Sequence, residues 1–220
     1  FLDKNGKAVG YSVTLARAIA RVMRMEVELK LGPWAEIRQA LEDGKIDAVA
    51  GMYYSAERDK VVDFSPPFII NHNAIFVRRD TSGIGTEEDL RGKDIIVMRD
   101  DIMCDYVREN ALCDTPVLAD SLPDALRLLA SGKHDCALVA QLPGLYWVKE
   151  LDLPNLVTVG PLLRPSESCF AVIEGNDALR YMLSEGLASL ENAGTHRLIR
   201  DRWLGTLIPK GISPSTVLKY

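Results

Sequence analysis

Apolar and polar positions follow two different periods along the chain, and their alternation predicts an α/β fold. Apolar residues recur every three to four positions between residues 11 and 24, which predicts a helix with a broad apolar face. Short apolar runs at Ile46–Ala50, Ile95–Met98 and Cys136–Ala140 are typical of buried strands. Helical patterns separate these runs, and such alternation favours parallel sheets covered by helices.

Turn and capping residues place the ends of the remaining elements. Residues 1–9 are expected to form a hairpin tip. Ser121 and Thr195 are expected to cap helices, and Thr86–Asp89 has the pattern of a capping box. Further strands are expected at Val27–Leu31, Pro116–Ala119, Leu156–Val159 and Ser168–Ile173, and further helices at residues 34–44, 102–112, 121–132, 143–151, 177–192 and 196–204.

A short motif occurs twice and indicates two similar lobes. Leu-x-x-Gly-Lys-x-Asp ends one predicted helix at residues 41–47 and another at residues 129–135, each time before a buried strand. Helix, glycine and strand recur in any α/β chain, but the matched lysine and aspartate favour the two-lobe interpretation. The expected lobes are residues 1–78 with 161–210, and residues 79–160. Chain crossings are expected at 79–85 and 160–161, and residues 211–220 form a tail.

Composition excludes several classes of protein. The 220 residues are 47% hydrophobic and 26% charged, an ordinary globular balance, and no apolar run is long enough to span a membrane. A net charge of −5 argues against a nucleic-acid surface. The cysteines and histidines lack metal-ligand spacing: Cys104, Cys113, Cys136, Cys169, His72, His134 and His196. A disulfide between the first two cysteines requires the helix between them to break.

The stretch Gly51–Phe68 carries the most informative chemistry. Gly51 is expected to open the backbone at the carboxyl end of a strand, the edge where open α/β sheets bind ligands. Ser55 is a candidate N-cap for the following turn, and Arg58 lies one turn further, where its planar fork can clamp a carboxylate. The alternative is that Arg58 only pairs with a neighbouring acidic residue at the surface, which stabilises little.

The pattern Ser-x-Glu-Arg-x-x-x-Val-Asp-Phe-Ser-x-Pro-Phe at residues 55–68, with Trp34 upstream, resembles the family 3 extracellular solute-binding proteins. These are polar amino-acid-binding domains of transport systems and of membrane histidine kinases. The resemblance implies a two-lobed, periplasmic-binding-protein-like (type II) fold, with each lobe a mostly parallel sheet flanked by helices. It also implies that Trp34 packs on the ligand, that Gly51, Met52 and Tyr53 contact it, and that Arg58 clamps its carboxylate.

The second lobe departs from the family pattern. After the strand at residues 95–98, family members commonly have glycine followed by two hydroxyl residues, whereas this chain has Arg99, Asp100 and Asp101. The aspartates either cap the next helix or face the cleft and bind an ammonium group. Gln141 stands where the family usually has an aspartate for the ligand's amino group. A zwitterion held between Arg58 and one of the two aspartates remains compatible with these residues.

The resemblance implies a small-molecule binding domain that closes around an amino-acid-like or carboxylate ligand, located in the periplasm or outside the cell. The residues after Gly205 extend further than is usual for free receptors, which favours the sensor domain of a histidine kinase tethered to the inner membrane through the rest of its chain. The alternative is the receptor of an ABC amino-acid transporter, whose partner is a permease. No cofactor is expected. An enzyme of the dehydratase type, with Asp100 or Asp101 as general acid or base, is the alternative of another class.

Overall fold

The computed structural model describes residues 1–205, which divide into two compact units. The first unit comprises residues 1–32, residues 36–70 and the described residues from Glu167 onward. The second unit comprises Pro33–Ala35 and Asn71–Ser166. The expected crossings at residues 79–85 and 160–161 therefore fall inside the second unit, and the expected tail lies outside the described residues.

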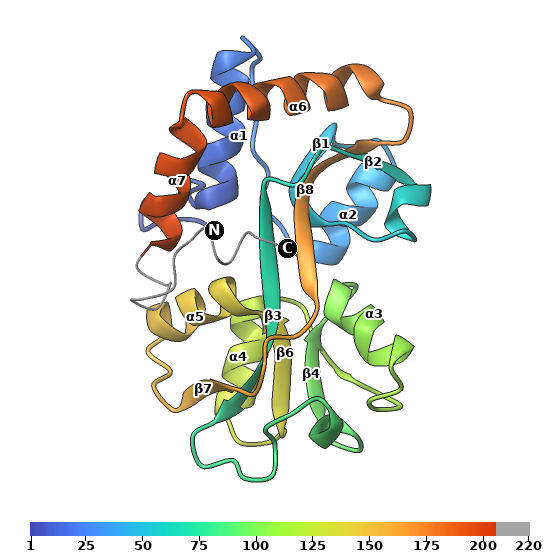
Figure 1. The fold of residues 1–220 in the computed structure, drawn as a ribbon, viewed down its shortest axis with the longest axis vertical. Coiled ribbons are helices and arrows are strands. Elements are labelled where there is room, and N and C mark those ends of the chain that lie inside the picture. The colour runs from blue at the N-terminus through green and yellow to red at the C-terminus, as the bar shows by residue number, and fades with distance from the viewer. Residues whose placement is uncertain (206–220) are drawn as a thin grey trace. The chain divides into compact units, whose positions relative to one another are not determined.

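Helices and strands alternate along most of the chain (Figure 1). The α-helices are α1 (Tyr11–Val22), α2 (Trp34–Glu42), α3 (Ile102–Glu109), α4 (Leu122–Ala130), α5 (Gln141–Glu150), α6 (Asp177–Asn192) and α7 (Thr195–Leu204). The strands are β1 (Ala48–Tyr53), β2 (Val62–Phe64), β3 (Ile69–Arg78), β4 (Ile95–Met98), β5 (Val117–Ala119), β6 (Cys136–Ala140), β7 (Leu156–Val159) and β8 (Pro165–Ile173). Two short 3₁₀ helices are η1 (Arg58–Lys60) and η2 (Glu88–Leu90). Within residues 1–205, no helix is long and apolar enough to cross a membrane.

The first unit is organised around β8 and three mutually packed helices. Strands β1 and β2 both pair with β8 in antiparallel orientation. Helices α1, α6 and α7 contact one another and bury Leu15, Ile19, Leu187 and Ile199 together with Phe170 of β8. The apolar stripe that predicts a helix at residues 11–24 is therefore the face that α1 turns toward this core.

The second unit contains a mixed sheet in the order β5-β4-β6-β3-β7. Strand β4 is parallel to both β5 and β6, whereas β3 is antiparallel to both β6 and β7. Helix α4 packs on β4, β5 and β6, and the shared core includes Phe76, Ile96, Leu126 and Val139. Pairing is thus antiparallel in the first unit and mixed in the second, with fewer parallel pairs than the alternation of elements suggested.

Local sequence signals placed several helix ends correctly. Gly44 and Gly132 follow α2 and α4 with positive φ angles of 68° and 83°, the left-handed conformation that commonly ends a helix. Ser121 caps α4 by accepting a hydrogen bond of 3.2 Å from the backbone N–H of Asp124. The expected cap at Thr195 is wrong, because Gly194 occupies the N-cap and Thr195 is already the first residue of α7.

The strand expected at Val27–Leu31 is not present; residues 24–33 have no regular secondary structure. Apolar and charged residues alternate there, as in a half-buried strand. However, Val27 and Leu31 are each 46% exposed, while Leu29 between them is half-buried. A period-2 pattern forms a strand only where a neighbouring strand supplies hydrogen bonds, and periodicity carries no information about that neighbour.

Candidate functional site

In the first unit, β1 continues through Gly51 to Tyr53, so the expected strand end at Ala50 is wrong. Gly51 has a φ of 115°, and the register with β8 shifts at this point, as in a β-bulge. A Cβ atom at Gly51 would lie 3.3 Å from Ser12 Oγ and 3.6 Å from Ser168 Oγ. The glycine thus lies close against two hydroxyl groups, which come from α1 and β8 and have no local sequence signal.

The capped turn after β1 holds Arg58 in a defined position. Ser55 Oγ accepts a hydrogen bond of 3.3 Å from the Arg58 backbone N–H, as predicted. The Arg58 side chain is not at an exposed edge, because the residue is only 2% exposed and its Nη1 donates to the Tyr53 carbonyl oxygen at 3.0 Å. Glu57 pairs with Lys60 at 2.7 Å. The guanidinium is thereby oriented toward the end of β1.

Met52 and Tyr53 contribute differently from each other. Met52 is 1% exposed, so its side chain belongs to the core and only its backbone can meet a ligand. Tyr53 is half-buried, and its carbonyl oxygen is the acceptor for Arg58. The polar groups that the end of β1 offers to a ligand are therefore backbone groups and one fixed guanidinium. Such groups recognise carboxylates.

In the second unit, Trp34 and the turn after β4 are joined directly. The indole Nε1–H of Trp34 donates to the carbonyl oxygen of Asp100 at 2.9 Å. Asp100 itself adopts a φ of 58°, in the left-handed region. Asp101 occupies the N-cap of α3, is 9% exposed, and forms no side-chain capping hydrogen bond to the helix. The turn is consequently fixed by an aromatic side chain that the sequence places 66 residues earlier.

Asp100, Asp101 and Gln141 lie at one edge of the second unit's sheet. Strands β4 and β6 are parallel, and the aspartates follow β4 while Gln141 is the first residue of α5, directly after β6. The carboxyl ends of parallel strands share an edge, which is where open α/β sheets bind ligands. Arg99 is engaged elsewhere, since its Nε pairs with Asp120 Oδ1 at 3.0 Å.

Metal and thiol chemistry have little support among the described residues. No group of three histidine, cysteine, aspartate or glutamate side chains is arranged to hold a metal ion within residues 1–205. Cys104 and Cys113 are both free thiols, so the disulfide between them is not formed. Burial raises the pKa values of the Cys136 and Cys169 thiols to about 12, which keeps both protonated at neutral pH.

Comparison with known proteins identifies a family and its members. The sequence profile of the bacterial extracellular solute-binding proteins, family 3, matches residues 1–206. The L-cystine-binding protein TcyJ of Escherichia coli (strain K12) is 28% identical over 212 residues, which cover 96% of this chain and 79% of that protein.

Two solved structures resemble the chain closely. A histidine kinase sensor domain with similarity to periplasmic binding proteins has a TM-score of 0.90 and 44% identity, covering 93% of this chain and 90% of its own. An ancestral arginine-binding protein, solved with arginine and with glutamine, has a TM-score of 0.87 and 32% identity, covering 93% of this chain and 92% of its own. These likenesses confirm the two-lobed, periplasmic-binding-protein-like α/β fold.

Proposed function

Because the chain belongs to the bacterial extracellular solute-binding proteins of family 3, we propose that it binds an amino acid and is the periplasmic sensor domain of a membrane histidine kinase. The observation that carries the sensor role is the likeness to a histidine kinase sensor domain, which is 44% identical over 93% of this chain. The ancestral arginine-binding protein is 32% identical and TcyJ is 28% identical over similar spans.

The proposed ligand contacts begin with its carboxylate. Arg58 is buried, and its contact with the Tyr53 carbonyl holds the guanidinium plane in one orientation. A fork fixed in this way loses little conformational entropy when a carboxylate binds to it. Gly51 has no side chain to cover its backbone, and the hydroxyl groups of Ser12 and Ser168 lie close to it.

The proposed contacts with the amino group come from the second unit. Asp101 is nine-tenths buried at the N-cap of α3, directly after the turn that follows β4. A carboxylate at this edge of the sheet can form a charge-assisted hydrogen bond with an ammonium group. Trp34 fixes the adjacent turn and offers an aromatic face to the aliphatic part of the ligand. Gln141 supplies a neutral polar group at the same edge of the sheet.

Mass spectrometry of the material that co-purifies with the protein, released by acid denaturation, tests the ligand class. We expect a stoichiometric amino acid, and we expect the same compound to raise the melting temperature of protein refolded without it. The Asp101→Asn variant should lose most of that shift, whereas Asp120→Asn, whose carboxylate pairs with Arg99, should keep it. A screen in which plain dicarboxylates give the largest shifts would reject the ammonium role of Asp101.

The coding sequence beyond residue 220 tests the sensor role. A membrane-spanning segment followed by a kinase domain is the expected continuation. A stop codon soon after residue 220 would instead favour the second candidate, a receptor of an ABC transporter, which the likeness to the L-cystine-binding protein supports. This result is independent of the identity of the ligand.

A further inference from the structure

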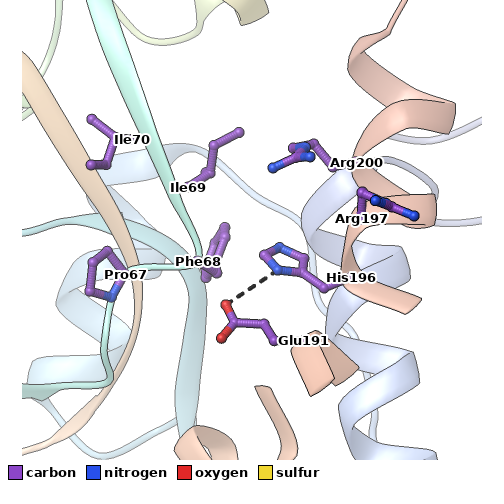
Figure 2. A pocket seen from close by; sticks show the side chains of 8 residues that line it. All are labelled: Pro67, Phe68, Ile69, Ile70, Glu191, His196, Arg197 and Arg200. Atoms are coloured by element: carbon purple, nitrogen blue, oxygen red, sulfur yellow. Dashed lines mark ion pairs between the residues drawn. The ribbon is translucent and has the colours of Figure 1, made fainter. Parts of the chain in front are cut away.

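A second pocket lies within the first unit and contains none of the residues assigned above to the ligand. Its volume is about 360 Å³, which is within the range of small-molecule sites. One wall is the end of the segment before β3 together with the first two residues of that strand, and the other is formed by α7 and the end of α6 (Figure 2). The lining residues are Pro67, Phe68, Ile69, Ile70, Glu191, His196, Arg197 and Arg200.

The two walls have different chemistry. Residues 67–70 are all apolar, whereas three of the four residues on the other wall are basic in type. Figure 2 shows that the side chains of His196 and Arg200 point toward Phe68 and Ile69, while Arg197 points away from them. The pocket therefore presents an apolar surface opposite a polar one, on which Arg200 is the cationic side chain that faces the apolar wall.

Arg200 supplies the available positive charge. Its Nε is buried and makes no hydrogen bond within residues 1–205, although it forms an ion pair with Asp201, whose Oδ1 lies 3.5 Å from that Nε. A guanidinium carries five N–H donors, so an anion in the pocket would find donors that the described residues leave unused. Asp201 is exposed and borders Arg200 without lining the pocket.

Three titratable groups near Arg200 are engaged with one another, namely Tyr11, Glu191 and His196. Tyr11 Oη lies 2.7 Å from His196 Nε2, and Glu191 Oε1 lies 3.4 Å from His196 Nδ1. Figure 2 shows the Glu191 carboxylate directed at the imidazole. Burial lowers the pKa of His196, so the imidazole is neutral at pH 7 and serves as a polar wall. Glu191, the one acid in the lining, is thereby held at the end of the pocket.

From this arrangement we propose that the pocket is a second binding site, specific for a small organic anion that has one carboxylate and a short apolar chain. The carboxylate binds the Arg200 guanidinium, and the apolar chain lies against Pro67 and Ile69. An inorganic anion would leave the apolar wall uncovered, and an amine would face Arg200 unfavourably. The site is distinct from the proposed amino-acid site, although Phe68 is close to both, since its Cζ lies 3.9 Å from the Cβ position at Gly51.

The test is a titration of isotope-labelled protein, refolded without ligand, with sodium hexanoate, followed by NMR. Hexanoate should produce saturable shifts in residues 67–70 and in α7. Hexylamine, which has the same chain and the opposite charge, should produce none. The Arg200→Gln variant should bind hexanoate at least about tenfold more weakly, the loss typical of a charge-assisted hydrogen bond. Arg200→Lys, which keeps the charge, should bind with intermediate affinity.

Two control variants separate this site from the proposed amino-acid site. Arg202→Gln removes the same charge from the same helix outside the pocket lining and should leave hexanoate affinity unchanged. Arg58→Met should also leave it unchanged, whereas it should weaken amino-acid binding by at least about tenfold. Equal binding by wild type and by a folded Arg200→Gln variant overturns the proposal, and so does loss of hexanoate binding in Arg58→Met. An absence of saturable shifts in wild-type protein overturns it as well, without bearing on the amino-acid site.

Discussion

Substitution of Arg58 distinguishes its structural contact from its proposed role in binding. The side chain is 2% exposed and donates a charged hydrogen bond of 3.0 Å to the Tyr53 carbonyl oxygen. Arg58→Met keeps an unbranched side chain of similar length but leaves that carbonyl without this donor. Arg58→Lys keeps a charge that can still reach the carbonyl, while it removes the planar fork.

The magnitudes follow from the burial of this contact. A hydrogen bond to a charged group contributes about 1.5–3 kcal/mol, and the near-complete burial of Arg58 means that solvent screening does not reduce this value. We expect Arg58→Met to lower the free energy of unfolding by about 2 kcal/mol, and Arg58→Lys by less than about 1 kcal/mol. Both variants lose the two-point contact with a carboxylate, so amino-acid affinity should fall by at least about tenfold in each.

Urea denaturation of the ligand-free protein measures the first effect, and calorimetric titration with the identified amino acid measures the second. Lys60→Met is the matched control, because Lys60 belongs to the same short helix but is exposed and, among the described residues, pairs with Glu57. It should change neither quantity appreciably. If Arg58→Met unfolds at the wild-type urea concentration, the buried contact with Tyr53 is not formed. If Arg58→Lys keeps full affinity, Arg58 is not a two-point carboxylate clamp.

Three further predictions concern the packing, the pH dependence and the thiols. Gly186→Ala should lower stability by about 1–3 kcal/mol in thermal unfolding, because the added Cβ would lie 2.6 Å from Ile19 Cγ2 where α6 meets α1; an unchanged melting temperature would contradict this packing. Burial lowers the pKa of His196 in the folded protein despite the nearby carboxylate, so the unfolded chain binds a proton at this residue more readily than the folded protein does. The free energy of unfolding should therefore be highest above about pH 6.5 and should fall at lower pH. His196→Gln should flatten the dependence of the free energy of unfolding on pH between pH 7.5 and 5.5. An unaltered dependence would show that other titratable groups cause it. Iodoacetamide should modify the partly exposed Cys113 before Cys136, because burial raises the pKa of the Cys136 thiol to about 12. Peptide mass spectrometry of the native protein measures the order of labelling, and earlier labelling of Cys136 would refute this prediction.

The sequence was sufficient where structure depends on local chemistry. The strands Ile95–Met98 and Cys136–Ala140 are buried apolar runs, and their observed bounds agree with the expected ones. The helix at Asp177–Asn192 also begins and ends where its periodicity indicates. Gly44 ends a helix because it adopts a positive φ, a preference that belongs to the residue itself. In each case a short segment contains the information that determines its own conformation.

The sequence was insufficient where structure depends on distant partners. Gly51 lies within β1 and not at its end, because β8, more than one hundred residues later, continues to pair with the strand beyond it. Arg58 has the local signature of an exposed turn, and its burial becomes visible only in the folded unit. The contact between Trp34 and the Asp100 carbonyl joins segments with no shared pattern. The sequence therefore proposes a set of candidate binding residues, but it does not show the contacts that each of them makes.

The most direct test of amino-acid binding is a calorimetric titration of ligand-free protein with three related compounds. They are the amino acid identified by mass spectrometry, the amine that lacks only its α-carboxylate, and the acid that lacks only its α-amino group. We predict saturable 1:1 binding of the amino acid and at least about tenfold weaker binding of each analogue, because each lacks one charge-assisted contact. Equal affinity for the amine would contradict carboxylate recognition by Arg58, and an absence of binding by all three compounds would contradict the proposed function.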